Sequence, residues 1–241
     1  GVKEEWLAAS KSCLDFMEAH CINHQAGDRM YFTVTEDGQP LRQRRYFYSE
    51  AFYASANAEY YGITGDKECL ERARRAYNLY WDLAHGAADP VGMGPKTIPE
   101  TRTGRSFGLP MIILNVIGIL LRVDPEHKEE YEQRAQQCID EIFQYHVKPD
   151  MKCLLENVAE DGTPRLNFTE GRIVNPGHDI EGVWFILEHA KRTGDTSLIP
   201  QAAHRCTVTC AQIQNPAGFQ TGHHQKNFCQ FRTAGIFRHH C

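Results

Sequence analysis

Apolar residues recur at intervals of three and four along most of the first 195 residues. This spacing gathers them on one face of a helix, where they can be buried together. The pattern predicts helices around Trp6, Leu7, Leu14 and Met17; Phe52, Tyr53, Ala56 and Tyr60; Leu70, Ala73, Tyr77 and Trp81; Leu109 to Leu121; Tyr131, Ala135, Cys138, Ile142 and Tyr145; and Ile180, Trp184, Leu187 and Ala190. The chain is therefore expected to be mostly α-helical.

Turn signals separate these segments. Gly or Pro ends one helix, and an Asp is placed to cap the next, at Thr64-Gly65-Asp66, at Val123-Asp124-Pro125 and at Thr193-Gly194-Asp195. Two Glu-Asp-Gly turns, at 36–38 and 160–162, are each flanked by short alternating runs. Such runs predict β-hairpins between helix pairs.

Repeated helix pairs indicate a solenoid or a closed α/α toroid, because one pair cannot bury its own apolar face. An irregular all-α domain without a repeat is the alternative, and a parallel α/β fold is disfavoured because short buried strands do not alternate with the helices. In a closed ring the inner helices converge on a central pocket. Chemistry is then expected at their N-termini and in the nearby loops.

Composition narrows the class of protein. The 241 residues contain 26 Lys and Arg against 31 Asp and Glu, and this negative balance argues against nucleic acid as a partner. The nearly apolar run 109–121 is too short to cross a bilayer and predicts a buried helix, so no membrane partner is expected. With no basic-then-apolar leader at its start and an odd number of cysteines, nine, the chain is expected to be cytoplasmic with reduced thiols.

The charge pattern changes near residue 196, since the last 46 residues contain no Asp or Glu. We therefore expect one domain over 1–195 and an atypical Cys/His-rich tail over 196–241. The tail has zinc-like ligand spacing, but the positions between the ligands are poorly suited to a core, and a shifted reading frame or mis-joined terminus fits better. The residues with this spacing are Cys206, Cys210, His223 and Cys229. No metal site is predicted.

The strongest chemical candidate is His178, in the segment Asn175-Pro176-Gly177-His178. Asn175 suits an N-cap and Pro176 the first helical position, so His178 falls in the first turn of a helix. Glu181 and Trp184 follow along one face. The positive end of the helix dipole disfavours an imidazolium, which predicts a neutral His178 near pH 7 that acts as a general base. The alternative is that His178 only caps the helix and Glu181 is a solvated acid.

Two further candidates are weaker. Ser49 and Glu50 lie among aromatic residues at a helix start, where they suit a sugar, unless Ser49 is simply a cap beside a solvated run of arginines. Asn115 is a lone amide in the apolar run and needs partners if buried, which makes a structural role as plausible as a place in a pocket.

Four ordered motifs carry a resemblance to a known family: 45–53 (RYFYSEAFY), 109–115 (LPMIILN), 154–158 (LLENV) and 175–185 (NPGHDIEGVWF). Together they closely resemble the N-acylglucosamine 2-epimerase family, whose mammalian member is also called renin-binding protein. The resemblance covers about residues 3–195. The elements Leu-Glu-Asn-Val, in the third motif, and Asn-Pro-Gly-His, in the fourth, resemble the acylglucosamine branch more than the cellobiose epimerase or ketose isomerase branches.

The resemblance implies an (α/α)6 barrel and an isomerase that interconverts N-acetylglucosamine and N-acetylmannosamine through proton transfer at C2. It implies catalytic roles for His178 and Glu181 and substrate contacts for Trp184, Glu50, Asn115 and Arg172. It also implies an amino-sugar substrate, no required cofactor, ATP as an effector, and a homodimer in the full-length family. No Gly-rich phosphate loop supports the ATP implication independently.

The sequence departs from the family in two motifs. Neither the Gly-Arg-Gln-Xaa-Trp-like motif nor the Trp-Trp-Pro-His-Xaa-Glu motif with the second catalytic His occurs here. About seven of the twelve barrel helices are therefore expected, in a chain that is unstable alone and has weak or no epimerase activity. The alternative function is a non-catalytic helical array that binds a protein partner, as the name renin-binding suggests.

Overall fold

The computed structural model describes residues 2–94, 98, 101 and 104–202. These residues form two compact units. One contains residues 1–103 and 112–137, and the other contains residues 104–111 and 138–241. The tail residues with zinc-like spacing, Cys206, Cys210, His223 and Cys229, lie outside the described residues.

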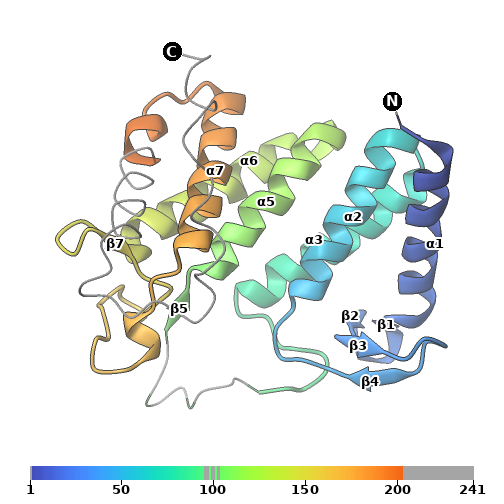
Figure 1. The fold of residues 1–241 in the computed structure, drawn as a ribbon, viewed down its shortest axis with the longest axis horizontal. Helices are drawn as coiled ribbons and strands as arrows, with labels where there is room; N and C mark the ends of the chain where they lie inside the picture. The colour runs from blue at the N-terminus through green and yellow to red at the C-terminus, as the bar shows by residue number, and fades with distance from the viewer. Residues whose placement is uncertain (1, 95–97, 99–100, 102–103, 203–241) are drawn as a thin grey trace. The chain divides into compact units, whose positions relative to one another are not determined.

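The first unit is built on two helices that run side by side, α2 (Tyr48–Thr64) and α3 (Lys67–Ala84) (Figure 1). Small buried residues on both helices allow the close approach, among them Ala54, Ala58 and Ala73. Gly65 ends α2 in the left-handed conformation with φ 73°, and the Asp66 side chain accepts a hydrogen bond from the Glu68 amide. The predicted turn is therefore confirmed.

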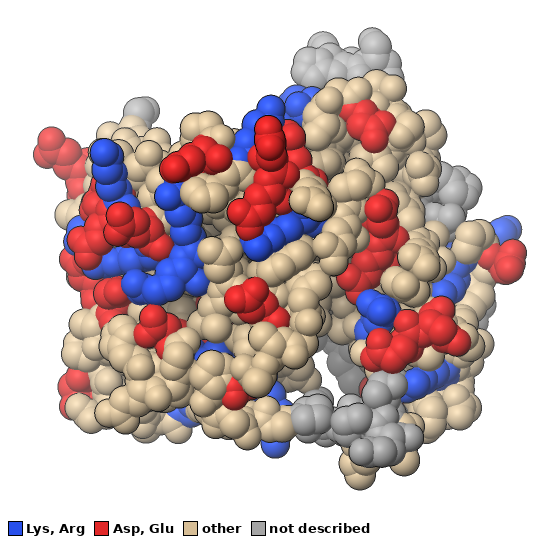
Figure 2. All heavy atoms as spheres, turned by 180° about the vertical axis from the view of Figure 1, so that it is seen from behind, with Lys and Arg blue, Asp and Glu red and all other residues tan. Residues whose placement is uncertain are grey.

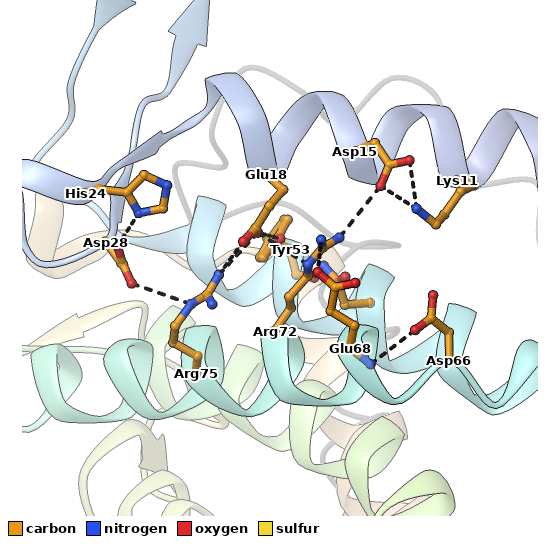
Figure 3. A network of polar contacts seen from close by, with 11 residues as sticks. Lys11, Asp15, Glu18, His24, Asp28, Tyr53, Asp66, Glu68, Arg72 and Arg75 are labelled. Atoms are coloured by element: carbon orange, nitrogen blue, oxygen red, sulfur yellow. Dashed lines mark hydrogen bonds and ion pairs between the residues drawn. The ribbon is translucent and has the colours of Figure 1, made fainter.

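Helix α1 (Glu4–His20) is attached to α2 and α3 mainly by polar contacts, since Leu14 is its one fully buried side chain. Arg75 donates to Glu18 at 2.9 Å, and Arg72 lies 3.7 Å from both Glu18 and Asp15 (Figure 3). Acidic and basic side chains lie interleaved on the face of the molecule drawn in Figure 2. Exposed ion pairs contribute little individually, but here partly buried charges share partners. These shared contacts, rather than a large apolar core, hold α1.

Two antiparallel ribbons follow α1. Strand β1 (Ile22–Asn23) pairs with β2 (Arg29–Met30), and β3 (Thr33–Val34) pairs with β4 (Pro40–Arg42). A short 3-10 turn, η1 (His24–Ala26), links the first two. The second ribbon contains the first Glu-Asp-Gly turn, where Gly38 has φ 84° and its amide donates to Thr35. The predicted hairpin is confirmed.

Helices α5 (Gly108–Val123) and α6 (Lys128–Glu141) each continue from one unit into the other, with η2 (Pro125–His127) between them. The expectation that Asp124 caps the next helix is wrong. Its carboxylate instead accepts two hydrogen bonds from Arg74, at 2.7 and 2.5 Å, and one from the Tyr131 hydroxyl. In the described part of the chain no single helix has the length and apolar character to cross a membrane; α5 and the segment after it reach those limits only as a bent pair.

The second unit begins with β5 (Arg105–Ser106), which pairs with β8 (Asn157–Val158). At the end of α6 the helix widens into a π-turn, η3 (Ile142–His146), and β6 (Val147–Lys148) and β7 (Cys153–Leu154) form a ribbon. The 3-10 turn η4 (Glu170–Arg172) precedes the last labelled helix, α7 (Pro176–Thr193). A small core lies beneath these elements and contains Cys153, Leu155, Val158 and Val174.

The second Glu-Asp-Gly turn repeats the first in detail. The Gly162 amide donates to Ala159 at 2.9 Å, and the Ala159 amide donates to Thr163 at 3.0 Å. The expectation of a hairpin around it is wrong, however, because the strand before the turn, β8, pairs with β5. Gly104 makes this pairing feasible, since a Cβ there would lie 2.4 Å from the Val158 carbonyl oxygen.

Candidate active site

The first turn of α7 has the geometry that the sequence predicts. The Asn175 side chain accepts hydrogen bonds from the amides of Gly177 at 3.2 Å and His178 at 3.4 Å, and Pro176 occupies the first helical position. These contacts satisfy amides that the helix itself leaves without partners. His178 is thereby placed in the first turn.

The His178 ring is paired with a carboxylate from another segment. Its Nδ1 atom lies 2.7 Å from Oε1 of Glu156. The Glu156 side chain is 11% exposed and that of His178 is 41% exposed. Because a carboxylate oxygen accepts, Nδ1 carries the hydrogen, and Nε2 remains the atom that can exchange a proton with a bound molecule.

The direction of the His178 pKa shift corrects a prediction. The hydrogen bond to Glu156 raises the pKa of His178 above its ordinary value, although burial of the ring acts in the opposite direction. Glu181 and Asp179 also raise it. The direction expected from the helix dipole is therefore wrong, because the nearby carboxylates raise the pKa of His178 instead of lowering it. A raised pKa makes Nε2 a stronger proton acceptor, which suits a general base.

Glu156 is held by its backbone on two sides. Its amide donates to the Ile173 carbonyl at 3.1 Å, and its carbonyl accepts from the Phe107 amide at 2.9 Å. The residue lies between β7 and β8, which pair with different strands. Sequence reasoning missed Glu156 as a site residue, although it used the motif at 154–158. A carboxylate inside a motif shared with a family of acid/base enzymes is the signal that was available.

The other predicted residues of this unit lie at exposed positions. Glu181 is exposed one turn after His178, and Trp184 is 58% exposed beside Phe185. Helical spacing brings both near the His178 turn, so α7 presents a carboxylate and an aromatic ring together with the imidazole. Arg172 is exposed at the end of η4, where it donates to the Leu166 carbonyl at 3.2 Å.

Glu50 and Asn115 belong to the other unit. Glu50 is in the first turn of α2, as predicted, and is 1% exposed. It accepts hydrogen bonds at 2.8 Å from Nε of the fully buried Arg29 and from the Met30 amide. These contacts describe a structural ion pair. Ser49 is not the cap, since α2 begins at Tyr48 after Phe47. Asn115 is half-buried on α5.

One group in the described residues has metal-ligand geometry. Single donor atoms of Asp124, Glu126 and His127 lie within 4.8 Å of one another. Asp124 is already engaged by Arg74 and Tyr131, and no metal site is inferred from this group.

Comparisons with known proteins identify the family. The family model described as N-acylglucosamine 2-epimerase (GlcNAc 2-epimerase) matches residues 1–219. The N-acylglucosamine 2-epimerase of Rattus norvegicus is 33% identical over 195 residues, which are 80% of this chain and 45% of the rat protein. A cellobiose 2-epimerase of Ruminococcus albus is 25% identical over 225 residues, 89% of this chain and 56% of that protein.

Solved structures agree in fold. The cellobiose 2-epimerase of Bacillus thermoamylovorans superposes with a TM-score of 0.72 at 20% identity, over 88% of this chain and 56% of that one. This likeness confirms the predicted (α/α)6 barrel class. The chain spans about half the length of the curated relatives it matches. With its fold, its ordered motifs and the family model in agreement, the chain belongs to the N-acylglucosamine 2-epimerase family.

Proposed function

We propose that this chain carries one acid/base of a sugar 2-epimerase, and that His178 is that group. The observation that supports the proposal is the 2.7 Å contact between His178 Nδ1 and Glu156, which leaves Nε2 of a partly exposed ring to exchange a proton. Glu156 is the positioning residue of the pair. It holds the ring in one tautomer and stabilises the imidazolium that forms when Nε2 takes a proton.

The chemistry needs only proton transfer. Once the sugar ring opens, the hydrogen on C2 lies next to an aldehyde and is acidic enough for a neutral imidazole to remove. Nε2 takes the proton, and the electrons of the C–H bond move onto the carbonyl oxygen as an enolate. A proton returned to the opposite face of C2 gives the epimer. His178 accounts for one face of C2, and no cofactor takes part in these steps.

An amino sugar is the proposed substrate. The N-acylglucosamine 2-epimerase of Rattus norvegicus is 33% identical to this chain, and two cellobiose 2-epimerases of Ruminococcus albus are 25% and 31% identical. The Leu-Glu-Asn-Val and Asn-Pro-Gly-His elements, which resemble the acylglucosamine branch, favour the amino sugar. We therefore propose interconversion of N-acetylglucosamine and N-acetylmannosamine, with Glu181 and the exposed Trp184 ring as the substrate-side groups on α7. ATP as an effector and a homodimer stay predictions of the family resemblance.

Deuterium exchange at C2 tests the proposal, because one competent base can introduce label without completing inversion. The chain is incubated in D2O with N-acetylmannosamine, N-acetylglucosamine or cellobiose, and the C2 proton signal is followed by NMR. We expect exchange of the amino sugars, a loss of about 10²-fold or more in His178→Asn, and no change in the control His24→Asn.

Exchange that persists in His178→Asn would overturn the assignment, and exchange of cellobiose alone would overturn the substrate. A chain that exchanges none of these sugars favours the second candidate function, a helical array that binds a protein partner. The exposed apolar side chains of Ile180 and Trp184 on α7 are the observation on its side.

A further inference from the structure

A second histidine lies behind the proposed acid/base pair. His146 ends the π-turn η3 and is 0% exposed. Its Nδ1 lies 2.8 Å from the Leu155 carbonyl oxygen. Its Nε2 is also buried, and among the described residues it has no hydrogen-bond partner. Because only a donor can satisfy a carbonyl oxygen, Nδ1 carries the hydrogen and Nε2 is the bare acceptor.

The ring is neutral over the ordinary pH range. The pKa of His146 is lowered to about 4, mainly by burial and also by the charges of Lys148 and Arg105, while the hydrogen bond to the Leu155 carbonyl acts in the opposite direction. A neutral ring with one fixed tautomer forms a directional contact.

The contact between His146 and Leu155 is double. In addition to the side-chain hydrogen bond, the Leu155 amide donates to the His146 carbonyl oxygen at 3.0 Å. Leu155 is itself 1% exposed, and Glu156 is the next residue along the chain. Both polar groups of the Leu155 backbone are therefore committed to His146, immediately before the carboxylate that holds His178.

The His146 ring also touches the packing that supports α7. The Phe107 ring lies against it with centroids 5.7 Å apart. Phe107 donates its amide to the Glu156 carbonyl at 2.9 Å and packs against Gly182 of α7, where a Cβ would come within 2.5 Å of the ring. His146 thus contacts the residue before Glu156 and the side chain on which α7 rests.

We propose that His146 is a positioning residue for the acid/base pair, holding the Leu155 carbonyl through Nδ1–H so that Glu156 faces His178. The catalytic meaning of this arrangement rests on the proposed function, but the arrangement itself does not. The π-turn supports the same view, because such turns interrupt the regular hydrogen bonding of a helix and are frequent where a side chain must be aimed.

The first measurement uses the unaltered chain. Long-range 1H–15N correlation spectra report which ring nitrogen of each histidine carries the hydrogen. We expect His146 in the Nδ1–H form at pH 7. The Nε2–H form would overturn the proposal, and this result does not depend on any variant folding.

The second measurement is the pKa of His178, determined by NMR titration. It is made only in variants that are folded and unfold cooperatively. Glu156→Gln sets the reference, because it removes the carboxylate that raises the pKa. His146→Leu is expected to lower the pKa of His178 by at least half as much. His146→Asn places an amide nitrogen near the position of Nδ1 and is expected to return the pKa toward the wild-type value.

Ile142→Ala is the matched control, since Ile142 is 1% exposed in the same π-turn but makes no side-chain bond to Leu155. It is expected to destabilise the fold and leave the pKa of His178 unchanged. A folded His146→Leu variant with the wild-type pKa of His178 would overturn the proposal, as would an equal shift in Ile142→Ala. Neither readout needs turnover, so a chain without exchange activity refutes the proposed function and leaves this test intact.

Discussion

Replacing Glu50 by glutamine removes one negative charge beside Arg29 while keeping the shape of the side chain. Both residues are essentially inaccessible to water, with 1% and 0% of their surfaces exposed. Arg29 retains Asp89, at 2.5 Å, together with the carbonyl oxygens of Arg44 and Tyr46. The substitution therefore separates two roles for Glu50: a member of a structural ion pair, and a contact for the sugar.

The size of the effect follows from the distance. Unit charges 2.8 Å apart attract by roughly 6 kcal/mol at an effective dielectric constant of about 20. Removing the carboxylate also removes the cost of burying it, which offsets part of this loss. Because Asp89 remains, we expect the free energy of unfolding to fall by about 3 kcal/mol, the lower end for breaking a buried pair.

Urea unfolding followed by circular dichroism measures this loss. Glu68→Gln is the matched control, because Glu68 is also a first-turn carboxylate paired with an arginine but is exposed; it is expected to cost less than about 0.5 kcal/mol. In a double-mutant cycle, Arg29→Met and Glu50→Gln together should cost less than the sum of the two single changes.

The C2 exchange rate per folded molecule completes the test, and we expect Glu50→Gln to change it less than about twofold. The reasoning fails if Glu50→Gln unfolds like the wild-type chain while exchange is lost. That result would return Glu50 to the substrate-binding role that the family resemblance implies.

Two further predictions concern acid stability and packing. Burial acts to raise the pKa of Asp124, but hydrogen bonds from Arg74 and others hold it at about 2. Since the unfolded value is near 4, its contribution is present above pH 4 and is lost as the pH falls toward 2. Asp124→Asn should lower the free energy of unfolding by about 2 kcal/mol at pH 7, and it should weaken the fall of that free energy between pH 4 and pH 2, measured by urea unfolding. An unchanged fall over this pH range would contradict the prediction. Gly182→Ala should cost about 1–3 kcal/mol through overlap with Phe107, despite the better helix propensity of Ala, and a stabilised variant by calorimetry would contradict it.

Periodicity and turn chemistry were sufficient to predict the local structure. The helices, the Asn175 cap with Pro176 and the paired Glu-Asp-Gly turns all depend on neighbours within a few residues, and the structure confirms them. Such interactions are visible in sequence because the residues that make them are adjacent in the chain.

Pairings between distant segments were not visible. Strand β8 pairs with β5 rather than with a strand next to it in sequence. The Asp124 carboxylate does not cap a helix but accepts hydrogen bonds from Arg74, fifty positions away. A turn signal specifies where the chain reverses, whereas the partner of a strand or carboxylate depends on which distant segments the fold brings together within a unit.

In the candidate site, too, local features were visible in the sequence and distant contacts were not. The sequence by itself determined that His178 begins a helix, because capping is local. Only the tertiary structure decided which group contacts the His178 ring and in which direction its pKa shifts. Glu156 lies on a segment that three backbone hydrogen bonds hold in place. Its carboxylate contacts the ring and raises the pKa, opposite to the shift expected from the helix dipole alone. The pKa of a group depends on all the charges, hydrogen-bond partners and burial within a few ångströms of it, and the fold decides which groups those are.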